Sequence, residues 1–144
     1  MEKTKSNNLF GGKETTVLFP DWLADDSLAV IEKSMGEVTS KCIVITEERK
    51  EHIKEKHQQD YDFVENNLKE ALLNPDLILE DNSNEDTILV IKHVSESGLN
   101  VVVRLQIAPN DLKYENSVIT AYRVGEVSVC RLIKKNTTLI DFTN

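Results

Sequence analysis

The dipeptide Asn74-Pro75 divides the chain into two parts with different hydrophobic periods, and this division restricts the fold more than any other feature. Before it, apolar side chains such as Val64 and Leu68 recur every three or four residues, which predicts a helix over residues 61–73. A proline disfavours helical geometry at the residue before it, so the helix ends there. After it, the sequence becomes rich in β-branched residues. Helices followed by a run of strands are typical of an α+β protein.

Five segments after the proline predict the strands of an antiparallel β-meander. Each is rich in β-branched residues and is bounded by turn-forming residues. We therefore expect N-terminal helices packed on an antiparallel sheet of four to five strands. The five segments are 77–80, 87–94, 99–107, 117–124 and 127–133.

The connection Gly125-Glu126 sets the register of the last two expected strands. A two-residue link that begins with glycine is typical of a tight hairpin. In that register Thr120 lies opposite Arg131, and Tyr122 shares their face of the sheet. The sequence therefore predicts a patch of hydroxyl and guanidinium groups there, which suits a phosphate or a ribose. The alternative is that threonine and tyrosine are present only because they form strands well.

Residues 1–40 differ in composition from the rest of the chain. Residues 1–16 are polar and rich in Lys, Asn, Gly and Thr, which predicts a loose arm. A short helix is expected over residues 27–35, before a glycine. We therefore expect an accessory arm and helix in the first 40 residues, followed by one main domain over residues 41–144.

A short strand and a charged helix are expected over residues 42–57. Residues 42–45 are apolar and β-branched, and Thr46 after them is a good N-cap. Glu47 and Glu48 then occupy the first turn, where the helix dipole favours acidic side chains. The helix should continue to the end of this segment.

The charged helix carries the residues that best suit a catalytic site. At 100° per residue, Arg49, His52 and Lys56 lie within about 60° of one another, and His57 lies about 80° from Arg49 on the other side. Two imidazoles supply a general base and a general acid near neutral pH, and an arginine beside them neutralises a phosphate. Metal-free RNA cleavage, in which the ribose 2′-OH attacks its own phosphate, needs little more. The alternative is an ordinary solvated helix face with one partly buried histidine.

The sequence disfavours a metal site and a cysteine nucleophile. Two histidines five residues apart converge poorly on a metal, and no HExxH motif is present. Cys42 and Cys130 lie in apolar, strand-like segments, where a free cysteine is usually a small buried hydrophobe. No glycine-rich phosphate loop or dinucleotide fingerprint is present. We therefore expect neither a metal nor a cofactor.

The charge distribution weakens a nucleic-acid-binding interpretation without excluding it. The net charge is −8, whereas a nonspecific nucleic-acid binder is normally basic. The acid is concentrated in residues 60–98, which carry 2 basic and 10 acidic side chains, while residues 99–144 carry 6 and 4. No apolar run approaches the roughly 18 residues of a membrane span, and the N-terminus lacks the apolar region of a secretory signal. With two well-separated cysteines, we expect a cytoplasmic protein with reduced thiols.

Three motifs taken together resemble a known superfamily. They are the helix motif IT-x-x-R-x-x-HI-x-x-x-H over residues 45–57, a second helix that ends in Asn-Pro-Asp, and the strand motif SVITAYR over residues 117–123. They resemble the phage-associated nuclease-like domains of the barnase–EndoU–colicin E5/D–RelE superfamily, called the BECR fold, over residues 42–140. The resemblance implies helices ahead of a four-stranded antiparallel sheet, an active site in the cleft between them, and metal-independent ribonuclease activity.

The resemblance also implies a role for individual residues. Arg49, His52 and His57 would be the helix-borne half of the catalytic site, and Thr120 with Tyr122 the sheet-borne half. The reaction would be transesterification of RNA to a 2′,3′-cyclic phosphate and a 5′-hydroxyl, with the two histidines as general base and general acid in either order. The expected substrate-binding cations are Lys56, Arg123 and Arg131.

The expected substrate is RNA, either tRNA or mRNA, and a toxin-like role would add a protein inhibitor as a partner. Two alternatives remain open. One is a non-catalytic protein-binding or regulatory module on the same fold, whose acidic residues 60–98 meet a basic partner. The other is a homo-oligomer formed through an exposed edge strand.

Overall fold

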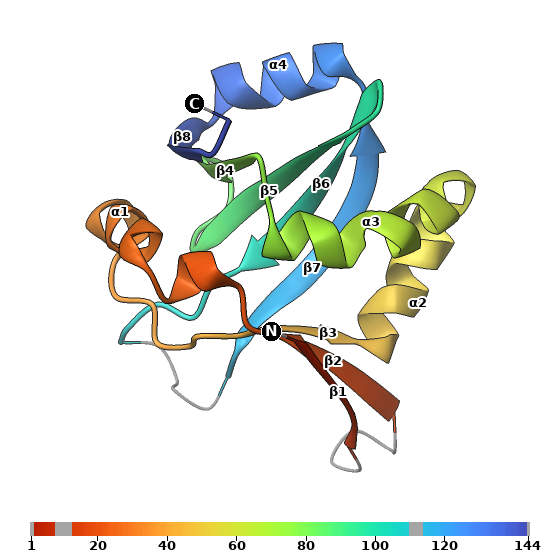
Figure 1. Cartoon of the computed structure of the whole chain (residues 1–144), viewed down its shortest axis with the longest axis horizontal. Coiled ribbons are helices and arrows are strands. Elements are labelled where there is room, and N and C mark those ends of the chain that lie inside the picture. The colour runs from red at the N-terminus through yellow and green to blue at the C-terminus, as the bar shows by residue number, and fades with distance from the viewer. Residues whose placement is uncertain (1, 8–12, 110–113, 144) are drawn as a thin grey trace.

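Eight strands form one mixed sheet in the part of the chain that the computed structural model describes, residues 2–7, 13–109 and 114–143 (Figure 1). The strands are β1 (Glu2–Asn7), β2 (Lys13–Leu18), β3 (Ile43–Thr46), β4 (Leu77–Glu80), β5 (Thr87–Val94), β6 (Ser97–Arg104), β7 (Asn116–Val124) and β8 (Thr137–Asp141). Their order in the sheet is β1-β2-β3-β7-β6-β5-β4-β8. The β3–β7 pair is parallel, and the other neighbouring pairs are antiparallel.

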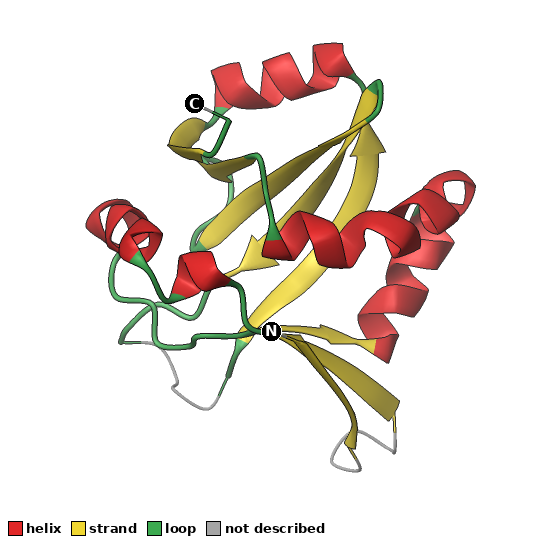
Figure 2. Cartoon of the chain, in the orientation of Figure 1, coloured by secondary structure: helices red, strands yellow, loops and turns green. Residues whose placement is uncertain are grey.

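Helices cover both faces of this sheet (Figure 2). The α-helices of the described residues are α1 (Asp26–Met35), α2 (Glu47–Lys56), α3 (Tyr61–Leu73) and α4 (Glu126–Lys135), and short 3₁₀ turns are η2 (Asp21–Leu23) and η3 (Gln58–Asp60). Side chains alternate between the two faces of a strand. In β5, Ile88 and Val90 join the large core cluster with α1 and α3, whereas Leu89 and Ile91 join a smaller cluster with α4. The fold is therefore α+β, as expected, with helices on both sides.

The sheet is larger than the sequence predicts. It has eight strands instead of four to five, and one pair is parallel rather than all being antiparallel. Strands precede the helices as well, because β1 and β2 pair with each other and β2 pairs with β3. The loose arm expected over residues 1–16 is therefore wrong. The division of the chain at residue 40 stays a prediction.

The hairpin expected after β7 is also wrong. Residues 126–135 form α4, and Gly125 is its N-cap in an extended conformation. Val129 and Leu132, one turn apart, both face the smaller core cluster. The sequence alone also fits a strand over these residues, because a short apolar run does not distinguish the helical period from the strand period. The chain then adds β8, which the sequence analysis did not anticipate.

The helices before the proline agree with the sequence. α3 has the predicted bounds, and α2 begins after Thr46, whose Oγ1 accepts a hydrogen bond from Arg49 N at 3.1 Å. A side-chain cap of this kind satisfies a backbone N–H that has no partner within the helix. This cap fixes where the helix that carries the candidate histidines begins.

Replacing Thr46 with alanine is expected to lower the free energy of unfolding by about 1 kcal/mol, because the cap bond is lost. Urea denaturation followed by circular dichroism measures this loss. Thr138→Ala, at an exposed position of β8, is the control and should change stability by less than about 0.5 kcal/mol. Equal effects of the two substitutions would show that the cap contributes nothing.

The pairing of β3 brings α2 alongside β7. β3 contacts β7 only at Ile43–Asn116 and Val44–Ser117, so the second half of β7 has no strand neighbour on that edge. α2 follows β3 directly and packs against β7 there (Figure 1). A charged helix thus lies next to the edge of the strand that carries the SVITAYR motif.

Candidate active site

His57 meets Tyr122 where α2 ends. His57 is the C-cap of α2, and its backbone N–H donates to Ile53 O at 2.8 Å. Its φ and ψ of −130° and 49° leave the helical range, which turns the chain away from the helix axis. The imidazole stacks on the Tyr122 ring, with a centroid distance of 5.4 Å and an interplanar angle of 28°. The structure therefore brings together one residue of the helix motif and one of the strand motif.

A β-bulge in β7 sets which side chains accompany Tyr122. Val102 pairs with Thr120 but Val103 pairs with Val118, so one extra residue lies between them in β7. Beyond the bulge, Thr120 and Tyr122 lie on one face of the sheet, while Ala121 between them belongs to the large core. Thr120 and Tyr122 of the strand motif therefore share the face that α4 only partly covers.

The hydroxyl groups of these two residues have different surroundings. The Tyr122 Oη accepts a hydrogen bond from Asn100 Nδ2 at 3.0 Å. Asn100 lies directly opposite Tyr122 on β6 and is fully buried. Thr120 Oγ1 is buried and has no hydrogen-bond partner among the residues that the structure describes. A buried hydroxyl without a partner is costly, so this atom is a candidate for a hydrogen bond to a ligand group or a water.

A hollow of about 660 Å³ opens above Thr120 and Tyr122. Its floor is the sheet, and its walls are α4 and the loop between β4 and β5. Arg104 and Lys135 place positive charge on it, and Asp81 and Glu85 place negative charge on it. The remaining lining residues are Ser83, Asn84, Thr87, Leu89, Val102, Ile119, Leu132 and Asn136.

The other residues of the helix motif lie on one side of α2. Lys50 points toward β2, where its Nζ donates to Thr16 Oγ1 at 3.3 Å. Arg49, His52 and Lys56 are all about 100° or more around the helix from Lys50. Arg49 and His52 are half-buried, Lys56 is exposed, and none of the three side chains has a hydrogen bond or ion pair with a described residue. They form a polar helix face whose side chains make no polar contacts with the described residues.

Two of the expected substrate-binding cations lie away from this site. Arg123 is on the other face of β7, where its guanidinium lies over the Phe63 ring at 4.6 Å and its Nε donates to Ser97 Oγ at 3.1 Å. Arg131 is exposed on α4 and does not lie opposite Thr120, which pairs with Val102. The expected Thr120–Arg131 pairing is wrong because it depended on a hairpin that is a helix.

Three site residues were missed by the sequence analysis. Asn100 and Arg104 alternate with apolar residues along β6 and look like a solvated strand face, and Lys135 lies beyond the segment expected to be a strand. The one available signal was Asn100, a polar residue in the middle of an apolar run. Its burial depends on the ring that covers it, and periodicity does not predict that.

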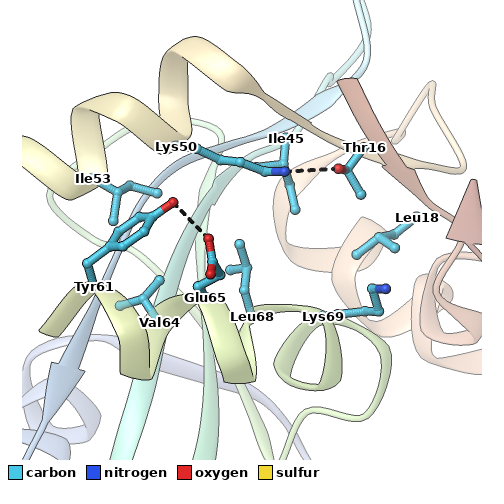
Figure 3. Close-up of a pocket in the computed structure, with 10 residues that line it drawn as sticks. All are labelled: Thr16, Leu18, Ile45, Lys50, Ile53, Tyr61, Val64, Glu65, Leu68 and Lys69. Atoms are coloured by element: carbon cyan, nitrogen blue, oxygen red, sulfur yellow. Dashed lines mark hydrogen bonds between the residues drawn. The ribbon is translucent and has the colours of Figure 1, made fainter. Parts of the chain in front are cut away.

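A second hollow, of about 300 Å³, lies between α2, α3 and β2 (Figure 3). Its floor is apolar, and Tyr61 Oη donates to Glu65 Oε2 at 3.1 Å on its rim. Burial, and then the nearby Glu65 carboxylate, raises the pKa of Tyr61 above its usual value. Lys50 on the same rim pairs with Glu47 at 3.4 Å. Its polar groups thus bond to one another, whereas Thr120 Oγ1 at the larger hollow has no partner among the described residues.

The described residues contain neither a metal-binding cluster nor a membrane-spanning helix. No group of three or more His, Cys, Asp or Glu side chains in that part of the chain is arranged to hold a metal ion. None of its helices is both long enough and apolar enough to cross a membrane.

One family model matches the chain. Its description is phage-Barnase-EndoU-ColicinE5/D-RelE like nuclease3, and it matches residues 24–126. The matched region includes α1, α2, α3 and the strands from β3 to β7, and hence both His57 and Tyr122. No curated protein and no solved structure matches the chain.

Proposed function

Because the chain belongs to the phage-Barnase-EndoU-ColicinE5/D-RelE like nuclease3 family, we propose that it is a metal-independent endoribonuclease. The 2′-hydroxyl of a ribose attacks the adjacent phosphorus, the P–O5′ bond breaks, and the products are a 2′,3′-cyclic phosphate and a 5′-hydroxyl. One group removes the 2′-OH proton and another protonates the leaving 5′ oxygen. The observation that carries this proposal is the His57–Tyr122 contact beside the unpartnered hydroxyl of Thr120.

The acid and base groups are His57 and His52. Support for His57 is its stacking on a residue that lines the large hollow. Support for His52 is its position on α2, on the side that carries Arg49 and Lys56. These cations lie close in sequence to both imidazoles and supply positive charge for the phosphate. In this step one histidine gains the 2′-OH proton and the other gives a proton to the leaving 5′ oxygen. The protons balance whichever histidine has which role.

The sheet residues hold the phosphate and the ribose. Thr120 and Tyr122 both line the hollow, where Arg104 and Lys135 add positive charge. Hydroxyl and guanidinium donors aimed at phosphate oxygens stabilise the charge that develops in the transition state. tRNA and mRNA are the substrate classes we propose, and a toxin-like role would require a protein inhibitor in the same cell.

Incubation of the full chain with mixed tRNA and mRNA in excess EDTA tests the proposal. We expect discrete fragments that carry a 2′,3′-cyclic phosphate, detected by their resistance to phosphatase until acid opens the ring. The same RNA with 2′-O-methyl riboses should remain intact, because the nucleophile is blocked. Cleavage that stops in EDTA would contradict the metal-independent mechanism. No cleavage at high protein concentration would reject ribonuclease activity and favour a protein-binding module on this fold.

A further inference from the structure

Asn100 and Asn116 are both fully buried in the sheet, but their amides are used differently. Asn116 Nδ2 donates to the carbonyl oxygens of Ser40 and Cys42, each at 2.9 Å, and its Oδ1 accepts from Gln106 N at 2.8 Å. These bonds join β7 to the segment before β3 and to the segment after β6. Asn116 therefore has a structural role, and its amide has a partner at both ends.

Within the described part of the chain, Asn100 makes one side-chain hydrogen bond, from Nδ2 to Tyr122 Oη. Its Oδ1 is buried and has no partner among the described residues. An unpartnered buried amide oxygen destabilises a fold, whereas a leucine of similar size would match the apolar side chains on the same face, Ile91 opposite it on β5 and Val102 two residues on. The amide at this position is thus unfavourable for stability. Its one described contact of this kind is the hydrogen bond to the phenol of Tyr122.

The bond to Asn100 determines what the Tyr122 hydroxyl offers to a ligand. Because the phenolic oxygen accepts from Asn100, its own hydrogen is left to donate to another group. The ring cannot turn away easily, since the imidazole of His57 stacks on it. Tyr122 lines the large hollow, and Asn100 does not. Asn100 therefore fixes the position of the phenol, while Tyr122 lines the hollow.

We propose that Asn100 is a positioning residue, which fixes the phenol of Tyr122 so that its O–H donates to a phosphate oxygen of the bound RNA. Asn100 acts through Tyr122 and does not touch the substrate, because it is fully buried. The proposal rests on the proposed function, in which Tyr122 contacts the phosphate.

A double-mutant cycle between Asn100→Leu and Tyr122→Phe tests the proposal. Asn100→Leu should lower kcat for RNA cleavage about tenfold, the value of one lost hydrogen bond, and should leave KM within about twofold. In the Tyr122→Phe background, Asn100→Leu should cause no further loss, because the group it positions is gone. An equal loss in both backgrounds would overturn the proposal.

Stability separates positioning from a structural role. Asn100→Leu should have a Tm equal to or above that of the wild type, because it removes an unpartnered buried acceptor. Asn116→Leu, the matched control, should have a clearly lower Tm, because it removes three hydrogen bonds to backbone groups. If Asn100→Leu does not fold, Asn100→Ala replaces it in the cycle. A fall in Tm equal to that of Asn116→Leu, without a change in kcat of the folded fraction, would show that Asn100 is structural.

A spectroscopic signal tests the contact independently of cleavage. The chain has three tyrosines, so protein labelled with 3-fluorotyrosine gives three fluorine resonances, and Tyr122→Phe identifies one of them. Asn100→Leu should shift this resonance and leave the resonance of Tyr114 in place. An unchanged Tyr122 resonance would overturn the inference. Failure of the wild type to cleave RNA would instead reject the proposed function, and the fluorine spectrum would still decide whether Asn100 holds the phenol.

Discussion

Replacing His57 with alanine lowers the rate of RNA cleavage by roughly 10²–10⁴-fold in our expectation, the usual contribution of a general acid or base. The cost in stability should be small, because the half-exposed imidazole has one described ring contact, which is worth about 1 kcal/mol at most. Single-turnover rates on a defined RNA, with urea denaturation of the same samples, measure both quantities.

The third histidine of the chain supplies the control for this substitution. His93 is exposed at the end of β5 and lines a separate hollow, so His93→Ala should retain the wild-type rate. His52→Ala should lose activity as His57→Ala does, and the wild-type dependence of kcat/KM on pH should be bell-shaped. Full activity of His57→Ala would remove this residue from the mechanism. A loss of stability as large as that of a core deletion would identify His57 as structural instead.

Replacing Trp22 with alanine is expected to lower the free energy of unfolding by about 3–5 kcal/mol, as for other large buried aromatic side chains. Trp22 lies in η2, is 2 % exposed, and its Nε1 donates to Leu72 O of α3 at 2.7 Å. The substitution thus removes core contacts and leaves a helix carbonyl without its partner. Because Trp22 is the single tryptophan of the chain, denaturation must be followed by circular dichroism.

The same measurement tests the expected division of the chain at residue 40. Val30→Ala on α1 is the control, because Val30 is 46 % exposed and its loss should cost less than about 0.5 kcal/mol. Trp22→Phe should lower the free energy of unfolding by an amount between those of Trp22→Ala and Val30→Ala, since it retains most of the apolar contact but not the hydrogen bond. If Trp22→Ala costs no more than Val30→Ala, the first 40 residues are accessory to the fold.

The sequence predicts an element best where local signals agree. α3, β4 and β5 have the expected bounds, because periodicity, the proline and the turn residues all mark the same ends. β1 and β2 were missed for the opposite reason. Their sequences, EKTKSN and KETTVL, are mostly polar, and they form strands only through pairing with each other and with β3.

Some residues of the candidate site were predictable from the sequence, but their arrangement was not. The chemistry of His57, Thr120 and Tyr122 is visible in the sequence, and the structure brings these three together. The position of α2 beside β7 depends on the parallel β3–β7 pair, which joins segments far apart in the chain. The bulge in β7 was not predictable either, and it puts Val118 in the large core although Val118 lies two residues before Thr120.

The parallel β3–β7 junction also has a consequence for the order of folding. The bonds around it join residues as much as 76 positions apart, whereas the β4–β7 strands and the α2–α3 pair are neighbours in sequence. Closing a long loop delays a contact, so we expect this junction to form late. Tyr122 lies in β7, and His57 lies at the end of the helix that follows β3. Before the β3–β7 pair forms, the chain would have its helices and the β4–β7 meander but no assembled site. A ribonuclease with this fold would therefore stay inactive until that pairing is made.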